Sequence, residues 1–212
     1  MDKLRCAVIG AGSMGAAHAL NAETSGLADI TAVCSRSLKS AETLVSRLDK
    51  KIPVYTDYCR MLDQEKLDSL VVCLPPGAHR GEVEDAAQRR IHLFLEKPLA
   101  LDLEKAQRML HAAEKSGVVT QVDFQHRFHP VVQRLKALLE TGEAGFPSLM
   151  QAGYYCNSLH TSWWGNIPPQ TQGQSAGPQR MGTLWKRSKR KKTFTNRPLS
   201  IFLKRYGREK EQ

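Results

Sequence analysis

The chain has 212 residues, a length that allows one well-packed core and part of a second domain. No apolar run approaches the roughly 20 residues of a membrane-spanning helix, and the first predicted strand begins too early to leave room for a signal peptide. The five cysteines include no Cys-x-x-Cys pair. We therefore expect a cytoplasmic, disulfide-free protein with reduced thiols, no membrane partner and no metal site.

The net charge of +10 is concentrated at one end of the chain. Residues 167–212 hold 12 lysines and arginines against 2 glutamates, whereas residues 1–166 hold 19 basic and 19 acidic side chains. The larger part of the chain thus has no basic bias, and we do not expect it to bind nucleic acid. A dense basic run at 186–192 is typical of a localisation signal, a nucleic-acid-binding arm or simply a solvated tail.

Short apolar runs alternate with amphipathic segments along the first 124 residues. Strands are predicted at residues 4–9, 29–34, 52–55, 67–74, 91–95 and 118–124. Helices are predicted at residues 13–24, 38–48, 57–62, 82–89 and 102–116, with Asp57 and Asp102 as N-caps and Gly117 at the end of the last helix. This alternation predicts an α/β fold with a doubly wound parallel sheet.

A helix at 131–140 and a strand at 147–156 follow the alternating series. The strand breaks the alternation, so we interpret it as the start of a second, α+β domain. The predicted organisation is a dinucleotide-binding domain at 1–125, an incomplete substrate domain at 126–166 and a basic tail at 167–212. Most of the tail lacks a regular apolar period, and we expect it to be mostly disordered.

The most informative motif is a Gly-x-Gly-x-x-Gly sequence between the first predicted strand and the first predicted helix. Gly10 allows the tight turn, Gly12 lets the backbone approach a pyrophosphate, and Gly15 lets the helix pack closely on its strand. Ser13 and Met14 lie at the helix start, where free N–H groups attract phosphates. The motif predicts dinucleotide binding; a glycine-rich turn without a ligand is the alternative.

Cofactor choice depends on the residue that ends the second strand. An NAD site usually has Asp or Glu there, about 20 residues after the glycines, to hold the ribose 2′-hydroxyl. This chain has Ser35, followed by Arg36. A serine does not repel a 2′-phosphate and an arginine pairs with it, so we expect NADP to be preferred, with NAD as the second cofactor. The alternative is an Arg36 that only faces solvent.

Lys97 is the candidate catalytic residue. It follows a predicted buried strand at 91–95, at the strand end where open α/β sheets bind their ligands. A lysine beside a nicotinamide ring can transfer a proton while hydride moves, provided that partial burial brings its pKa toward neutrality. The alternative is an ordinary surface lysine in a loop.

Five motifs follow one another along the chain: the glycine motif at 10–15, Leu74-Pro75-Pro76 followed by His79, Glu96-Lys97-Pro98-Leu99-Ala100, Val122-x-Phe124-x-x-Arg127-Phe128-x-Pro130, and Gly142-Glu143-x-Gly145. In this order they resemble the glucose–fructose oxidoreductase / inositol dehydrogenase / MocA family, over residues 3 to about 166. The resemblance is specific because several ordered motifs agree.

The resemblance implies an NAD(P)-dependent oxidoreductase that acts on a sugar, a polyol or a related secondary alcohol. Its partners would be a nicotinamide dinucleotide and a small carbohydrate-like substrate. Lys97 would be the active-site lysine, with a cis peptide bond before Pro98. The resemblance places the following residues beside the nicotinamide and its ribose: Leu74, Pro75, Pro76, His79, Glu96 and Lys97.

The chain departs from the family pattern after residue 166. The family continues with an Asp-x-x-x-His pair that works with the lysine, but residues 167–212 contain neither Asp nor His. The antiparallel sheet that completes the substrate pocket and much of the oligomer interface is missing as well. A shifted reading frame or a truncated gene explains both losses, so we expect defective catalysis in this chain.

Two other hypotheses remain at this point. The first is a non-catalytic dinucleotide-binding sensor whose basic arm binds a nucleic acid. The second is a remnant that does not fold stably. Salt-sensitive DNA retention would favour the sensor. An unpaired, partly apolar strand edge at 147–156 would favour the unstable remnant.

Overall fold

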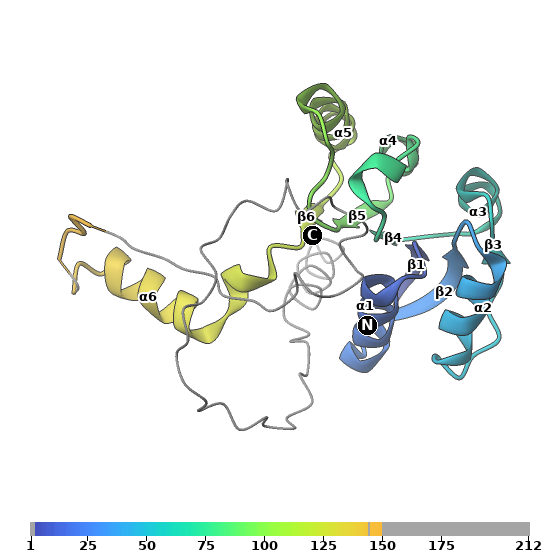
Figure 1. Cartoon of the computed structure of the whole chain (residues 1–212), viewed down its shortest axis with the longest axis horizontal. Coiled ribbons are helices and arrows are strands. Elements are labelled where there is room, and N and C mark those ends of the chain that lie inside the picture. The colour runs from blue at the N-terminus through green and yellow to red at the C-terminus, as the bar shows by residue number, and fades with distance from the viewer. Residues whose placement is uncertain (1–2, 144, 150–212) are drawn as a thin grey trace, which may run out of the picture. The chain divides into compact units, whose positions relative to one another are not determined.

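The computed structural model describes residues 3–143 and 145–149. Its parallel strands form one six-stranded sheet with the order β3-β2-β1-β4-β5-β6 (Figure 1). The strands are β1 (Leu4–Ile9), β2 (Ala28–Cys34), β3 (Val54–Tyr55), β4 (Ser69–Val72), β5 (His92–Leu95) and β6 (Thr120–Val122). This order is that of doubly wound dinucleotide-binding sheets, so the predicted fold class is confirmed.

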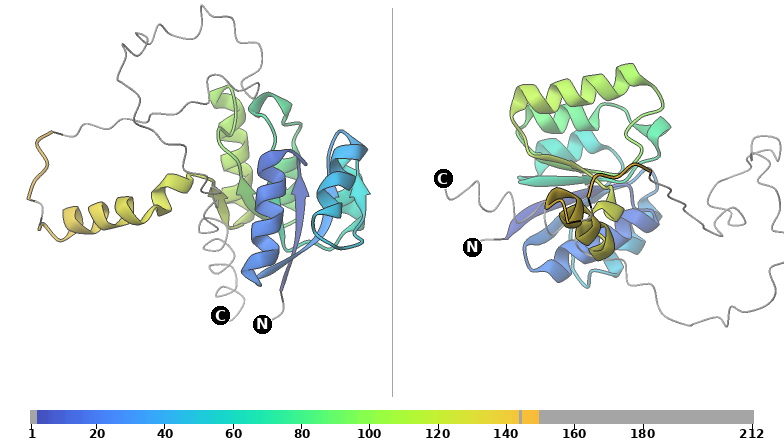
Figure 2. Two further views of the ribbon diagram at one scale, coloured as in Figure 1. Left: turned by 60° about the horizontal axis from the view of Figure 1, so that its bottom comes forward. Right: turned by 90° about the vertical axis from the view of Figure 1, so that its left-hand side faces the viewer.

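The helices are α1 (Ser13–Ser25), α2 (Leu38–Ser46), α3 (Tyr58–Gln64), α4 (Glu82–Gln88), α5 (Leu103–Ser116) and α6 (Pro130–Glu140), with short 3₁₀ helices at Pro76–Ala78 and Gln125–Phe128. The first five cover the two faces of the sheet (Figure 2). Helices α1 and α2 lie on one face, and α3, α4 and α5 lie on the other. No helix in the described ranges is long and apolar enough to cross a membrane.

The core follows the period of two along the strands. On β1, Cys6 and Val8 face one hydrophobic cluster, in which α1 contributes small residues such as Ala19. Ala7 and Ile9 face the second cluster, on the other side of the sheet. Because β1 is buried on both faces, it reads as a nearly continuous apolar run in the sequence, as expected for a central parallel strand.

Helix ends follow the predicted capping chemistry. The side chain of Asp57 accepts a hydrogen bond from the N–H of Cys59 at the start of α3, and that of Asp102 accepts one from Lys105 at the start of α5. Gly117 ends α5 in the left-handed conformation, with φ of 65°, which glycine adopts without strain. The predicted roles of Asp57, Asp102 and Gly117 are therefore confirmed.

The predicted strands at 52–55, 67–74 and 118–124 are shorter in the structure, where they span Val54–Tyr55, Ser69–Val72 and Thr120–Val122. The sixth strand ends at Val122 rather than at 124, because the N–H of Phe124 turns back to the carbonyl of Val122 and a 3₁₀ helix follows. Pro147 to Leu149 form no strand: proline has no N–H for a ladder, and the described ranges place no strand beside them. The rest of the predicted strand at 147–156, and the tail at 167–212 with its basic run, lie outside the described residues.

Two compact units share the chain, and the first contains the whole sheet. This unit extends to Arg134, and the second begins at Leu135, within α6. Helix α6 has no buried residue, although Val131, Leu135 and other apolar residues lie along it. The predicted domain boundary at 125/126 stays a prediction.

Candidate functional site

The carboxyl ends of neighbouring strands are joined by backbone hydrogen bonds just beyond the strands themselves. These bonds run from the N–H of Gly10 to the carbonyl of Cys34, from Cys73 to Ile9, from Glu96 to Val72 and from Asp123 to Leu95, with N–O distances of 2.8–2.9 Å. The loops that carry the predicted site residues are thereby held along one edge of the sheet. This edge is where doubly wound sheets bind ligands, at the point between β1 and β4 where the strand order reverses.

Two of the three motif glycines are required by close backbone contacts. Gly10 has φ of +98°, and a Cβ atom there would lie 2.3 Å from the carbonyl oxygen of Cys73. A Cβ atom on Gly15 would lie 1.8 Å from the carbonyl oxygen of Gly10, so the start of α1 approaches the β1 turn as only glycine permits. Gly12 differs, because nothing lies within 4 Å of its ideal Cβ position.

The N-terminus of α1 is open to an anion. Gly12 is its N-cap, no side chain caps it, and its first turn has no acidic residue. Helices α2, α3 and α5 are capped instead by Ser37, Asp57 and Asp102. Uncapped N–H groups and the positive end of the helix dipole favour a phosphate at this position. Ser13 is exposed there and Met14 is half-buried.

Ser35 and Arg36 follow β2 on the same edge. The N–H of Ser35 donates to the carbonyl of Tyr55 at 2.9 Å, which fixes the backbone at the strand end. Arg36 is exposed, and the structure gives its guanidinium no hydrogen bond or ion pair within the described ranges. The side chain predicted to recognise a 2′-phosphate is therefore available to a ligand.

The segment after β4 carries His79, which is held by contacts of its side chain and of its backbone. Its carbonyl accepts a hydrogen bond from Nζ of Lys105 at 2.6 Å. Leu74 packs against the core, Pro75 is exposed and Pro76 opens a 3₁₀ helix. The buried ring of His79 pairs through Nδ1 with the carboxylate of Glu82. Burial alone would raise the pKa of Glu82, but the hydrogen bonds from His79 and from the N–H of Arg80 lower it below its ordinary value. The predicted place of His79 beside a nicotinamide ribose stays a prediction.

Glu96 and Lys97 follow β5 and differ sharply in exposure. Glu96 is buried with 8% of its surface exposed, whereas Lys97 is an exposed residue. The carboxylate oxygen Oε2 of Glu96 accepts the backbone N–H of Lys97 at 3.0 Å. The predicted cis peptide bond between Lys97 and Pro98 is confirmed. The described residues do not provide the partial burial that a proton-transferring lysine needs.

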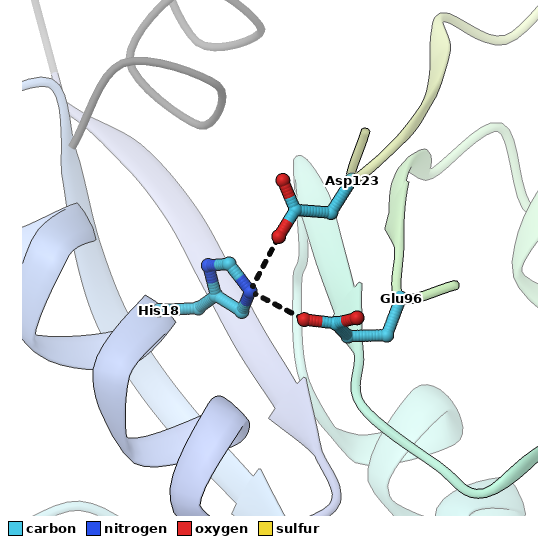
Figure 3. Close-up of side chains that lie close together, drawn as sticks. All are labelled: His18, Glu96 and Asp123. Atoms are coloured by element: carbon cyan, nitrogen blue, oxygen red, sulfur yellow. Dashed lines mark hydrogen bonds and ion pairs between the residues drawn. The ribbon is translucent and has the colours of Figure 1, made fainter. Parts of the chain in front are cut away.

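A buried cluster of His18, Glu96 and Asp123 joins three elements at this edge (Figure 3). His18 reaches from α1 and places Nε2 3.1 Å from Oε1 of Glu96 and 3.4 Å from Oδ2 of Asp123. Two members, His18 and Asp123, were not predicted as site residues. The signal for His18 was a polar residue on the alanine-rich, core-facing side of the first helix; the signal for Asp123 was an acid directly after an apolar strand.

Electrostatics favour a cation on the clustered histidine and neutral thiols on and beside the central strands. Burial alone would lower the pKa of His18, but the hydrogen bonds to Asp123 and Glu96 outweigh it and raise the pKa to about 9. Burial raises the pKa of Cys6 and of Cys34 to about 11, and that of Cys73 well above its ordinary value. These three free thiols therefore stay protonated at neutral pH, and none is an activated nucleophile.

Comparison with known proteins gives the family. Residues 4–124 match the family model described as "Oxidoreductase family, NAD-binding Rossmann fold", which covers proteins of the glucose–fructose oxidoreductase / inositol dehydrogenase / MocA type. The chain is 32% identical over 147 residues to scyllo-inositol 2-dehydrogenase (NAD(+)) of Bacillus subtilis, and this alignment covers 68% of the chain and 42% of that protein. It is 34% identical over 154 residues to inositol 2-dehydrogenase/D-chiro-inositol 3-dehydrogenase of Lacticaseibacillus casei, covering 71% and 44%.

Solved structures agree with this assignment. The scyllo-inositol dehydrogenase of Lactobacillus casei, crystallised with NAD(H) and scyllo-inositol, aligns with a TM-score of 0.63 at 25% identity, over 68% of this chain and 43% of that one. The chain thus spans about four-tenths of the length of the relatives that it matches. With its matching sheet, glycine turn and motif order, the chain belongs to the glucose–fructose oxidoreductase / inositol dehydrogenase / MocA family of oxidoreductases with an NAD-binding Rossmann fold.

Proposed function

We propose that this chain binds a nicotinamide dinucleotide along the carboxyl edge of its sheet, as the cofactor-binding part of an oxidoreductase. The observation that carries the proposal is the pairing of an uncapped α1 N-terminus with open space at Gly12. A pyrophosphate would accept hydrogen bonds from the first N–H groups of α1, with no Cβ atom in its way. The nicotinamide end would then extend toward the turn that carries Glu96 and Lys97.

We further propose that the cofactor is NADP in preference to NAD. The support is local: Ser35 brings no negative charge to the end of β2, and the exposed guanidinium of Arg36 has no partner within the described ranges. A guanidinium binds a phosphate through two parallel hydrogen bonds, which NAD does not offer at this position.

The proposed substrate class is an inositol or a related polyol or sugar with a secondary hydroxyl group. It rests on the three relatives described above, all of which are named as inositol dehydrogenases. The bound cofactor would supply the hydride acceptor. In its neutral form, the amine of Lys97 would accept the hydroxyl proton at the carbon that is oxidised, and it would return that proton in the reverse direction.

The experiment is a titration of the full 212-residue chain with NADPH and with NADH, in which calorimetry measures the binding. We expect NADPH to bind more tightly than NADH. Arg36→Ala should weaken NADPH binding about tenfold or more and leave NADH binding unchanged, since a lost charge-assisted pair is worth roughly 1.5–3 kcal/mol. Lys39→Ala is the matched control, because it removes an exposed positive charge three residues further along the chain. Equal or tighter NADH binding by the unmodified chain contradicts the NADP preference.

A further inference from the structure

We propose that His18 is a positioning residue for Lys97 and that it acts through Glu96. The contacts start on α1 and pass to the carboxylate of Glu96 (Figure 3). The other oxygen of that carboxylate accepts the backbone N–H of Lys97. This inference rests on the proposed function for the task of the Lys97 amine, but the contacts themselves can be tested without a cofactor.

The two oxygens of Glu96 have different partners. Oε1 lies 3.1 Å from Nε2 of His18, and Oε2 accepts the N–H of Lys97 at 3.0 Å. The terminal torsion of a glutamate is soft, so a carboxylate held at one point still rotates. With His18 bound to one oxygen, the other oxygen is directed at the first residue of the turn. His18 therefore sets the direction of the hydrogen bond that holds Lys97.

Asp123 and Phe94 fix the imidazole itself. Oδ2 of Asp123 lies 3.4 Å from the same Nε2, and the ring of Phe94 contacts His18 edge-on at a centroid distance of 5.0 Å. The relative exposures of His18, Glu96 and Asp123 are 5%, 8% and 2%. Buried carboxylates need polar partners, and Nε2 of His18 contacts one oxygen of each of the two.

The charge of His18 strengthens both contacts. The carboxylates of Glu96 and Asp123 face the imidazole from the ends of β5 and β6, and they raise the pKa of His18 to about 9 in spite of burial. Cys73 lies at the end of β4, and burial raises the pKa of its thiol well above the ordinary value, so it adds no charge at neutral pH. The first turn of α1 contributes no acidic residue. Near pH 7, His18 thus makes charge-assisted hydrogen bonds, which are about twice as strong as neutral ones.

The hydrogen bond to Glu96 fixes the backbone from which the exposed side chain of Lys97 extends. The direction in which that side chain leaves the Glu96–Lys97 turn therefore depends on this support. Helix α1 carries the glycine turn at one end and His18 in the middle, so one rigid element would hold both the phosphate site and the lysine. Misplacement of a reacting group by about 1 Å costs on the order of a hundredfold in rate.

The first test follows the unmodified full chain by carbon-detected NMR from pH 6 to pH 10, without cofactor. The imidazole carbons of His18, the carboxyl carbon of Glu96 and the backbone nitrogen of Lys97 should titrate together, with one inflection near pH 9. A Lys97 nitrogen whose chemical shift does not respond when His18 titrates overturns the proposal.

The second test compares variants at pH 7 by amide hydrogen exchange, corrected for global stability. His18→Leu should lower the protection of the Lys97 N–H about tenfold relative to β1 amides, whereas His18→Gln keeps a donor and should retain most of it. His111→Leu, at an exposed position of α5, is the matched control. Equal protection of Lys97 in all variants contradicts a positioning role.

The cluster of His18, Glu96 and Asp123 also has the spacing of a small metal site, since one nitrogen or oxygen atom of each residue lies within 4.8 Å of the others. Titration with zinc separates a metal-binding role from the positioning role. Tight, stoichiometric zinc binding that is lost in His18→Leu overturns the positioning role.

Cofactor titrations on the same samples distinguish this inference from the proposed function. A chain that binds neither NADPH nor NADH contradicts the proposed function, while the Lys97 response still decides this inference.

Discussion

Substitution of Gly15 by alanine tests how closely α1 approaches the β1 turn. The new Cβ atom would lie 1.8 Å from the carbonyl oxygen of Gly10, whereas real Cβ atoms essentially never come closer than 3.0 Å. The helix and the turn must therefore separate by about 1.2 Å, the difference between these two distances. Both contacting groups belong to the backbone, so no side-chain rotation relieves the clash.

The cost should lie at the upper end of the range for overpacking, about 3 kcal/mol. Thermal unfolding should then occur roughly 10 °C lower than in the unmodified chain, since each kcal/mol shifts a domain of this size by about 3–5 °C. Circular dichroism and urea unfolding measure both quantities. Gly10→Ala should be similarly destabilising, because a Cβ there would lie 2.3 Å from a backbone oxygen of Cys73.

Gly12→Ala is the matched control, with the opposite expected pattern. Nothing lies within 4 Å of its Cβ position and its φ is −79°, so alanine fits. Loss of a glycine N-cap and the gain from a less flexible unfolded chain nearly cancel, and stability should change by less than about 1 kcal/mol. Cofactor affinity should fall at least tenfold, because the methyl group would block the phosphate. Unfolding of Gly15→Ala at the unmodified temperature, or full cofactor affinity in Gly12→Ala, would refute this reasoning.

Three further predictions address pH, capping and turnover. The pKa of His18 rises from 6.5 unfolded to about 9 folded, so its stabilisation, on the order of 3 kcal/mol, is complete below pH 6.5 and is lost as the pH approaches 9. Urea unfolding of the unmodified chain against His18→Gln isolates this contribution. Asp102→Ala should cost about 1 kcal/mol through the lost cap of α5, and Asp102→Asn only a few tenths. The chain should bind cofactor without oxidising inositols or sugars, because the family pattern pairs Lys97 with an Asp-x-x-x-His motif and residues 167–212 hold no Asp or His. Steady NAD(P)H formation would contradict this.

The sheet and its helices could be predicted because each depends on local patterns. Buried parallel strands are apolar on both faces, and caps such as Asp57 and Asp102 act within three residues of their position. Strand ends were less predictable. They depend on which neighbouring carbonyl accepts each N–H, and Phe124 turns back on Val122 although its apolar side chain suits a strand.

The site was predictable only where a motif carries the information. The glycine turn and the Glu96–Lys97 pair have fixed spacings in the sequence. The contact of His18 with Glu96 bridges 78 positions, and Asp123 joins them from a third element. No helical or strand period links residues at such separations, so the cluster follows only from the tertiary packing of α1 against the ends of β5 and β6.

The backbone bond from Ser35 to Tyr55 has a consequence for how cofactor choice can change over time. It fixes the end of β2 without using a side chain, and the next helix begins with the cap at Ser37. Ser35 and Arg36 thus lie in a short segment between β2 and α2, where side chains neither pack in the core nor cap a helix. Mutation can sample acidic, neutral and basic residues there at little cost in folding. Preference for one nicotinamide cofactor is therefore an evolvable trait of this scaffold, separable from its stability.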